Sequence, residues 1–201
     1  MEKPFSEACA RNRDPLLGVL REALAASHSV LEVGSGTGQH AVHFAAHLPH
    51  LTWQTSELPA LHAGIRAWLD EARLPNLRPP LALDVAGDWP AGPFDAVFTA
   101  NTLHIMAWPL VEKFFAGAAR VVAGGGVLAV YGPFCYGGVH TAQSNAHFDQ
   151  WLKARDAASG IRDFENIRVL ALTAGFAFVR DVPMPANNRT LLFRRLSESA
   201  A

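Results

Sequence analysis

Three glycines at alternate positions carry the clearest chemistry in this 201-residue chain. They lie in Glu32-Val33-Gly34-Ser35-Gly36-Thr37-Gly38, between an apolar stretch and a helical pattern. Glycine is required where the backbone turns sharply or where a ligand comes too close for a Cβ atom. A strand, a glycine loop and a helix in succession indicate a nucleotide-type ligand. The spacing differs from the Gly-x-Gly-x-x-Gly loop that places a pyrophosphate on a helix N-terminus, which disfavours a nicotinamide dinucleotide.

Three carboxylates end three consecutive predicted strands. Glu32 precedes the glycine loop, Glu57 follows Gly38 by 19 residues, and Asp84 lies just before Val85. A carboxylate at position 32 would repel a pyrophosphate, but it can attract an α-ammonium group directly or through water. Glu57 can accept both hydroxyls of a ribose, and Asp84 can accept an adenine amino group while Val85 packs against the ring. Each carboxylate alone has an ordinary structural explanation, but together they indicate S-adenosylmethionine.

Asn101 and His104 follow the fourth predicted strand. Asn101 suits contact with the methionine end of the cofactor, and the alternative is a helix N-cap or turn residue. The imidazole of His104 can take a proton from a hydroxyl, thiol or ammonium acceptor, and the alternative is a histidine hydrogen-bonded at a helix start. The predicted cofactor-binding residues are Glu32, Gly34, Ser35, Gly36, Thr37, Gly38, Glu57, Asp84, Val85 and Asn101, with His104 as the candidate catalytic residue and no metal ligand.

The order of the predicted elements positions these residues. Asp14-Pro15 fits an N-cap followed by the first position of a helix. Strands alternating with helices predict a parallel sheet with right-handed crossovers. Strands are expected at 29–33, 51–55, 79–85, 94–100 and 126–132, and further helices at 39–48, 59–73 and 109–122.

The last third of the chain breaks this alternation. Helices at 146–158 and 164–174 precede strands at 177–182 and 190–195. The link between these two strands is too short for a parallel crossover, so the pair should be antiparallel. We therefore expect one α/β domain over the whole chain. It should be Rossmann-like and doubly wound, with a mainly parallel seven-stranded sheet and an antiparallel C-terminal hairpin. Residues 1–14 are a candidate lid over the cofactor.

These features resemble the class I S-adenosylmethionine-dependent methyltransferases over residues 29–195. A closer resemblance, over nearly the whole chain, is to a largely uncharacterised group whose human member is called methyltransferase-like protein 26. The resemblance implies the fold and the cofactor but no substrate. At the ribose position the group often has Asp, and the longer side chain of Glu57 still reaches the hydroxyls. The segments that carry the closer resemblance are Phe5-Ser6, Arg11-Asn12, Ala100-Asn101-Thr102-Leu103-His104-Ile105, Tyr131-Gly132-Pro133-Phe134, Ser144-Asn145, Gly160-Ile161-Arg162-Asp163-Phe164-Glu165 and Met184-Pro185-Ala186-Asn187-Asn188.

The acceptor pocket should come from segments outside the sheet. One candidate is the first dozen residues, and another is the aromatic segment 131–145, whose glycines would let it move as a lid. The alternative for 131–145 is a tight turn at the end of the sheet. Arg162, Asp163 and Glu165 either orient polar substrate groups or cap the helix that follows.

Composition excludes several classes of protein. Lys plus Arg (17) nearly balances Asp plus Glu (18), and the densest cationic cluster, Arg194-Arg195 with Arg189 nearby, lies in a predicted strand. Nucleic acid is therefore not expected as a substrate. Cys9 and Cys135 match no metal-ligand spacing and are expected to be reduced thiols in a cytoplasmic protein. The apolar runs are too short for a membrane span.

The expected function is methyl transfer from S-adenosylmethionine to a small-molecule acceptor. Two alternatives stay open: a non-catalytic S-adenosylmethionine-binding partner of another protein, and a nicotinamide-dependent oxidoreductase.

Overall fold

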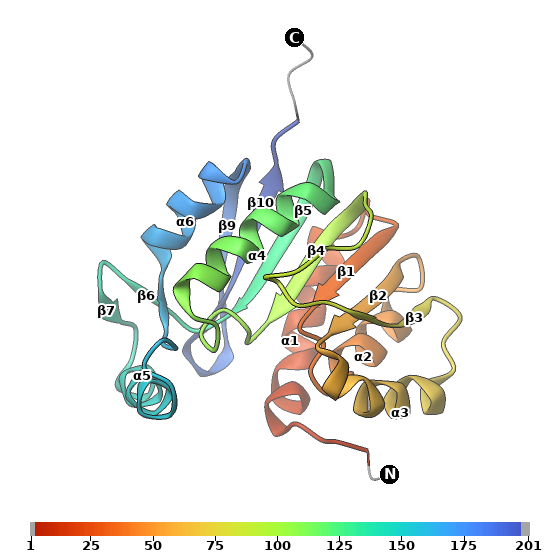
Figure 1. The fold of residues 1–201 in the computed structure, drawn as a ribbon, viewed down its shortest axis with the longest axis horizontal. Coiled ribbons are helices and arrows are strands. Elements are labelled where there is room, and N and C mark those ends of the chain that lie inside the picture. Colours follow the sequence, from red (N-terminus) through yellow and green to blue (C-terminus); the bar gives the residue numbers. More distant parts are fainter. Residues whose placement is uncertain (1–2, 198–201) are drawn as a thin grey trace.

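The computed structural model describes residues 3–197 and shows a seven-stranded sheet with helices on both faces (Figure 1). β1 pairs in parallel with β2 and β4, β2 with β3, and β4 with β5, whereas β10 is antiparallel to both β5 and β9. The predicted fold class, including the antiparallel hairpin at the sheet edge, is confirmed. In sheet order the strands are β3 (Leu77–Ala82), β2 (Thr52–Glu57), β1 (Ser29–Val33), β4 (Phe94–Ala100), β5 (Val122–Gly132), β10 (Asn188–Arg195) and β9 (Phe176–Met184).

The helices divide between the two faces of the sheet. In Figure 1, α4 (Trp108–Val121) and α6 (Phe164–Thr173) lie in front of the sheet. Behind it lie α1 (Glu7–Ala23), α2 (Gln39–His47) and α3 (His62–Ala72). The remaining α-helix, α5 (Gln143–Arg155), lies at the lower left, away from both layers. Short 3-10 turns at Pro59–Leu61 and Pro185–Asn187 precede α3 and join β9 to β10.

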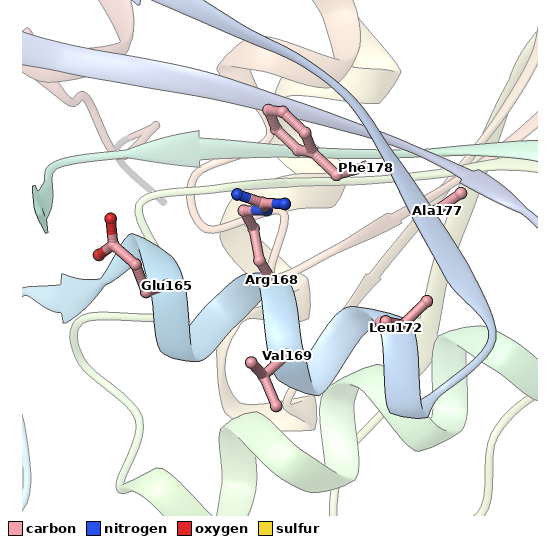
Figure 2. A pocket seen from close by; sticks show the side chains of 6 residues that line it. All are labelled: Glu165, Arg168, Val169, Leu172, Ala177 and Phe178. Carbon is pink, nitrogen blue, oxygen red and sulfur yellow. The ribbon is translucent and has the colours of Figure 1, made fainter. Parts of the chain in front are cut away.

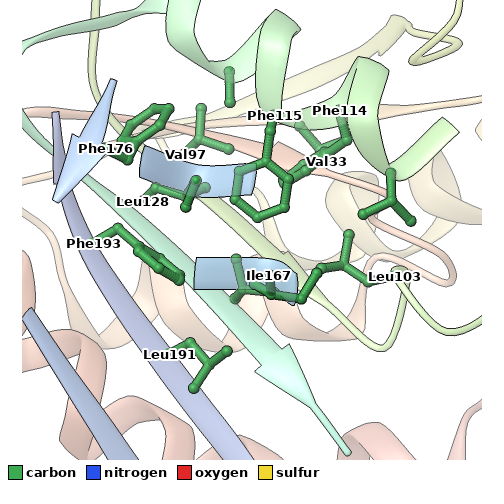
Figure 3. Packing of buried hydrophobic residues seen from close by; sticks show 14 of the residues in the cluster. Val33, Val97, Leu103, Phe114, Phe115, Leu128, Ile167, Phe176, Leu191 and Phe193 are labelled. Carbon is green, nitrogen blue, oxygen red and sulfur yellow. The ribbon is translucent and has the colours of Figure 1, made fainter. Parts of the chain in front are cut away.

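Each face of the sheet has its own apolar core. On the front face, Val33 of β1 packs in one cluster with Phe115 of α4 and Ile167 of α6 (Figure 3). On the back face, Leu16 of α1 and Phe44 of α2 pack in the other cluster. Burial of a side chain of this size contributes about 1.5–3 kcal/mol, so these helices are fixed to the sheet mainly by their apolar faces.

The first helix differs from its prediction. It begins at Glu7, where the Ser6 hydroxyl caps it by accepting from the backbone N–H of Cys9 at 3.4 Å, and Pro15 lies inside it. Proline removes a helical hydrogen bond and favours the first turn, which is why the start was expected at Asp14-Pro15. That expectation is wrong: the Ser6 cap starts the helix earlier, and Asn12 in its first half is buried and hydrogen-bonded to His40 of α2, so tertiary contacts override the local preference. Of the candidate lid 1–14, residues 1 and 2 lie outside the described residues, and residues 7–14 form the first half of α1.

The segment 131–145 is not an open loop. It contains the end of β5, a hairpin of β6 (Phe134–Tyr136) and β7 (Val139–His140), and the first residues of α5. Gly137 and Gly138 have φ of +56° and +77°, as the two central residues of a tight hairpin turn require. With β8 (Arg162–Asp163) the hairpin forms a small second sheet. The tight turn considered as the alternative is therefore what the structure contains.

The other boundaries agree closely with the predictions. Only β5 departs by more than three residues, because it begins at Val122 rather than at 126. The glycines before position 126 continue the strand opposite a register shift between Phe94 and Ala96. Such an irregularity lets a glycine-rich segment pair where an ideal strand would not.

Candidate cofactor site

The glycine loop joins β1 to α2 at the carboxyl ends of the parallel strands. Gly34, Gly36 and Gly38 have φ of +76°, +57° and +90°, a backbone conformation that favours glycine. A Cβ at Gly34 would lie 2.4 Å from the Cγ2 of Thr102, whereas the same position at Gly36 has no neighbouring atom within 4 Å among the described residues. The loop is therefore closed on the side that faces β4 and open on the side of Gly36.

Glu32 braces this loop from inside the protein. Its side chain is 2% exposed, and one carboxylate oxygen accepts from the Ser35 hydroxyl at 2.9 Å and from the Trp53 indole at 3.1 Å. Burial raises the pKa of Glu32 to about 7, and the hydrogen bonds from Trp53 and Ser35 act in the opposite direction. Trp53 is a site residue that the sequence did not reveal. Trp53 and Thr55 alternate along β2 and are both buried. This alternation is the only feature of the sequence that could have pointed to Trp53.

A second set of contacts ties the loop to the end of β2. The backbone N–H groups of Gly34 and Ser35 donate to the carbonyl of Ser56 at 3.1 and 3.0 Å. In return, the backbone N–H of Ser56 donates to the Ser35 hydroxyl at 3.2 Å. The loop is thus held in one conformation by backbone contacts 21 or more residues apart in sequence.

Glu57 lies directly against the glycine loop. One of its carboxylate oxygens accepts from the backbone N–H of Gly36 at 2.9 Å, and the other from that of Leu58 at 2.9 Å. Its carbonyl accepts from the N–H of Leu83 at 3.1 Å, which brings the end of β3 to the same edge. Two of the predicted strand-end carboxylates, Glu57 and Asp84, therefore lie at the same edge of the sheet, at the ends of neighbouring strands.

Asp84 and Val85 form the turn after β3. The Asp84 side chain is exposed and accepts from the backbone N–H of Ala86 at 2.8 Å. Val85 is half-buried and packs against the front core. An exposed carboxylate beside an apolar side chain can receive a planar ring that carries an amino group.

Asn101 ends β4 with a left-handed backbone, at φ +60°. Its N–H donates to the carbonyl of Tyr131 at 2.8 Å, and the Thr99 hydroxyl below it donates to the carbonyl of Val33 at 2.8 Å. The hydroxyls of Thr99 and Thr102 also contact each other. Asparagine tolerates this backbone conformation better than most residues. Asn101 therefore acts as a turn residue, whether or not its side chain also binds a ligand.

His104 is buried against α5 rather than open to solvent. Its ring packs edge-on against Phe148 at 5.3 Å between centroids, and its carbonyl accepts from the N–H of Gly160 at 2.8 Å. Burial, with a smaller contribution from the charge of Arg162, lowers the pKa of His104 to about 4. The imidazole is therefore neutral at pH 7 and a weak base.

Arg162, Asp163 and Glu165 hold structure together. The Arg162 guanidinium donates to the carbonyl of Leu103 at 3.0 Å and to that of Met106. Asp163 caps α6 by accepting from the N–H groups of Glu165 and Asn166, and it also accepts from Gly138 at 2.8 Å. The capping explanation holds for Asp163, and one carboxylate oxygen of Glu165 accepts from the backbone N–H of Gly137 at 2.9 Å.

The first turn of α1 adjoins the glycine loop. The N–H of Ser6 donates to the Gln39 side chain at 2.5 Å, and the same oxygen accepts from the Thr37 hydroxyl at 3.0 Å. Further along the helix, Asn12 is buried and its Oδ1 lies 2.6 Å from Nε2 of His40 in α2. The N-terminal segment thus lines one side of the site.

A groove of about 480 Å³ lies elsewhere, between α6 and β9 (Figure 2). Figure 2 shows Arg168 of α6 directed toward Phe178, with the guanidinium 5.2 Å from the ring centroid. None of the predicted cofactor residues reaches this groove. It is lined by Glu165, Arg168, Val169, Leu172, Ala177 and Phe178.

Residues 3–197 contain neither a membrane-spanning helix nor a cluster of metal-ligating side chains. No helix in this part of the chain combines the length and apolarity needed to cross a bilayer. Within the same range, no three His, Cys, Asp or Glu side chains are grouped in a way that could hold a metal ion.

Solved methyltransferase structures share this fold. An O-methyltransferase family protein from Burkholderia thailandensis matches with a TM-score of 0.83 and 19% identity, over 96% of this chain and 59% of that chain. An O-methyltransferase family 2 protein from Planctomyces limnophilus DSM 3776, in complex with apigenin, matches with a TM-score of 0.82 and 18% identity, over 94% and 60%. The S-adenosylmethionine-dependent methyltransferase SibL matches with a TM-score of 0.80 and 22% identity, over 94% and 56%.

At these identities the likeness shows the fold, and this chain spans less than two thirds of each of those three proteins. The sequence itself matches a family model over residues 3–195. The chain belongs to the family described as "Protein of unknown function (DUF938)".

Proposed function

We propose that this protein is an S-adenosylmethionine-dependent methyltransferase acting on a small-molecule acceptor. The observation that carries the proposal is the open glycine loop at Gly36 with the Glu57 carboxylate bound to it. Asp84 stands exposed at the next strand end of the same sheet. The likeness to SibL and to the apigenin-bound O-methyltransferase supports both the donor and the class of acceptor.

The residues present fit this cofactor. The space beside Gly36 admits a ligand close to the backbone, and Glu57 can exchange its two backbone donors for ribose hydroxyls. Asp84 would accept the adenine amino group, and Asn101 would contact the methionine end of the cofactor. Glu32, Ser35 and Trp53 would hold the loop in shape rather than touch the open face. When bound, the cofactor supplies a methyl group on a sulfonium, and orientation by these residues can lower the barrier by up to about 7–11 kcal/mol.

His104 remains our candidate base, with a narrower role than expected. A base of pKa about 4 is already unprotonated at pH 6, so it cannot by itself produce a rise in rate between about pH 6 and 8. Replacement by Asn and measurement of methyl transfer between about pH 4 and 8 tests the role. An unchanged profile in H104N would remove His104 from the mechanism.

We propose further that the acceptor is not a nucleic acid and that the chain is related to the methyltransferase-like protein 26 group. The clustered arginines are already engaged: Arg195 donates to the carbonyls of Ala119 and Gly175, and Arg189 pairs with Asp181 at 2.6 Å. That leaves little of this cluster free to bind phosphates. We expect a cytoplasmic setting and a small-molecule acceptor for this protein.

Titration calorimetry with S-adenosylmethionine, S-adenosylhomocysteine and NAD tests the donor. We expect both adenosyl ligands to bind and NAD not to bind, and tight binding of NAD alone would overturn the assignment. In D84N the affinity for S-adenosylhomocysteine should fall about tenfold, as expected for the loss of one hydrogen bond to a charged group. D88N, in the same turn, is the matched control and should bind like the wild type.

A metabolite extract tests the reaction. Mass spectrometry should detect one metabolite that gains a methyl group when protein and cofactor are added together. Binding without any methylated product would favour the cofactor-binding partner protein instead.

A further inference from the structure

The imidazole of His104 is a buried polar group without a hydrogen-bond partner. The residue is 6% exposed, and no group of residues 3–197 hydrogen-bonds either ring nitrogen. Both nitrogens nevertheless keep some accessible surface. Buried polar side chains are as a rule hydrogen-bonded within the protein or to water. The polar edge of this ring is therefore available to a molecule from outside the chain.

His104 lies beside the proposed cofactor site. It follows Thr102, which packs against Gly34 of the glycine loop. The carbonyl of His104 accepts from the N–H of Gly160 at 2.8 Å, and the Arg162 guanidinium donates to the preceding carbonyl at 3.0 Å. The turn that carries the imidazole is thus fixed at the same edge of the sheet as the loop.

One side of α5 leads from His104 to the solvent. Phe148 packs edge-on against the His104 ring at 5.3 Å between centroids, and Trp151 stacks on Phe148 at 5.8 Å with an interplanar angle of 19°. The guanidinium of Arg155 lies 4.7 Å from the centre of the Trp151 ring. Residues three and four apart lie on one side of a helix. Phe148, Trp151 and Arg155 are called the α5 stripe below.

The α5 stripe is not what fastens the helix. The buried side of α5 carries Asp149 and Leu152. Asp149 pairs with Lys153 at 2.6 Å, whereas Arg155 forms no ion pair with a carboxylate of residues 3–197. Trp151 is 50% exposed. A half-exposed indole and a guanidinium without a carboxylate partner therefore stand next to the imidazole that has no hydrogen bond.

We propose that the methyl acceptor is a planar aromatic compound with a hydroxyl group and a carboxylate, and that it lies along the α5 stripe. This inference rests on the proposed methyl transfer. The hydroxyl donates to the unprotonated nitrogen of His104, the aromatic ring packs against Phe148 and Trp151, and the carboxylate pairs with Arg155.

The transfer step needs one proton acceptor. The acceptor oxygen forms a bond to the methyl carbon, the bond from that carbon to sulfur breaks, and the sulfur keeps the electron pair. The hydroxyl proton passes to the lone pair of His104, whose ring is neutral before attack because burial lowers its pKa to about 4. An aromatic hydroxyl suits so weak a base better than an aliphatic one, since a phenol is the more acidic of the two.

Titration calorimetry in excess S-adenosylhomocysteine tests recognition without turnover. The probes are 4-hydroxybenzoate, 4-hydroxycinnamate and 3,4-dihydroxybenzoate, each compared with its methyl ester. We expect at least one acid to bind about tenfold more tightly than its ester, because only the acid can pair with Arg155. R155Q should lose this preference. R168Q, which removes a guanidinium that lies over Phe178 in the groove, is the matched control and should keep it.

Two further variants test the other contacts of the same probe. W151A should weaken the acid and its ester alike by about three- to tenfold, since stacking surface is lost, whereas L172A in the groove should change neither. Wild type should also prefer the hydroxy acid to the corresponding methoxy acid by about tenfold. H104F, which keeps a ring beside Phe148 but accepts no hydrogen bond, should lose that preference.

Thermal unfolding identifies any variant that does not fold, and R155Q and W151A change only exposed side chains. Failure of all three acids to bind the folded wild type would overturn the proposal. So would an acid–ester preference that survives in R155Q together with unchanged affinity in W151A. Either outcome leaves the proposed function intact if S-adenosylhomocysteine binds. Binding of the acids that depends on Arg155, without binding of S-adenosylhomocysteine, would refute the donor and support the aromatic-acid site.

Discussion

The glycine-loop edge and the groove between α6 and β9 are opposite kinds of surface. At the loop, buried polar groups such as Glu32 and Ser56 hold a backbone that is open on one side. The groove measures about 480 Å³, its exposed walls are mostly apolar, and Val169 and Leu172 are 66% and 62% exposed. The comparison indicates that a ligand site is recognised by polar groups that converge at strand ends, and that the volume of a groove is a poorer guide.

A valine at Gly34 should produce the largest effect. The side chain would collide with Thr102 and would also force a branched residue into φ +76°, so we expect a loss of about 3 kcal/mol or more in stability. S-adenosylhomocysteine binding should be undetectable in calorimetry. Gly137→Val is the matched control, since φ is +56° but no described atom crowds the position. Normal binding by Gly34→Val would break the contrast between the two surfaces.

Glu32→Gln should change the pH dependence of stability. The pKa of Glu32 is about 7 in the folded protein against an ordinary 4.5, so between these values the folded state holds more protons than the unfolded state. Stability from this group is therefore fully present below pH 4.5 and falls by about 3 kcal/mol as pH rises toward 7. E32Q should lack this decline, and urea unfolding across that range should show its advantage over wild type growing with pH.

Glu165→Gln, at the end of the groove, is the control for that measurement. A difference between E32Q and wild type that stays constant from about pH 4.5 to 8 would mean that burial does not raise the pKa of Glu32 in the folded protein.

Glu57→Ala should weaken S-adenosylhomocysteine binding by about 10–100-fold, because a charged acceptor of two hydrogen bonds is lost. Calorimetry measures the change. Glu57→Asp keeps the carboxylate and should retain most of the affinity. An alanine variant that binds as well as the wild type would remove Glu57 from the site.

Leu172→Ser should have the smallest effect. The side chain is exposed in the groove, so stability should change by no more than about 0.5 kcal/mol and ligand binding not at all. Thermal unfolding and calorimetry together check this. A tenfold loss of S-adenosylhomocysteine affinity would show that the groove takes part in binding after all.

The sequence alone determined the sheet, the glycine loop and the positions of the strand-end residues. These depend on local rules: apolar strands of limited length, glycines where φ is positive, and a link too short for a parallel crossover. Once β1, β2 and β3 are parallel, Glu57 and Asp84 must share one edge, which needs no knowledge of side-chain contacts.

Only the tertiary structure decided how those residues are supported. Trp53 meets Glu32 across 21 residues of chain, and Asn12 meets His40 across 28. The helix start at Glu7 depends on packing that outweighs Pro15. Such pairings are set by burial and by the need to satisfy buried polar groups, and neither leaves a periodic mark in the sequence. The glycine loop was therefore predictable, whereas the brace beneath it and the surroundings of His104 were not.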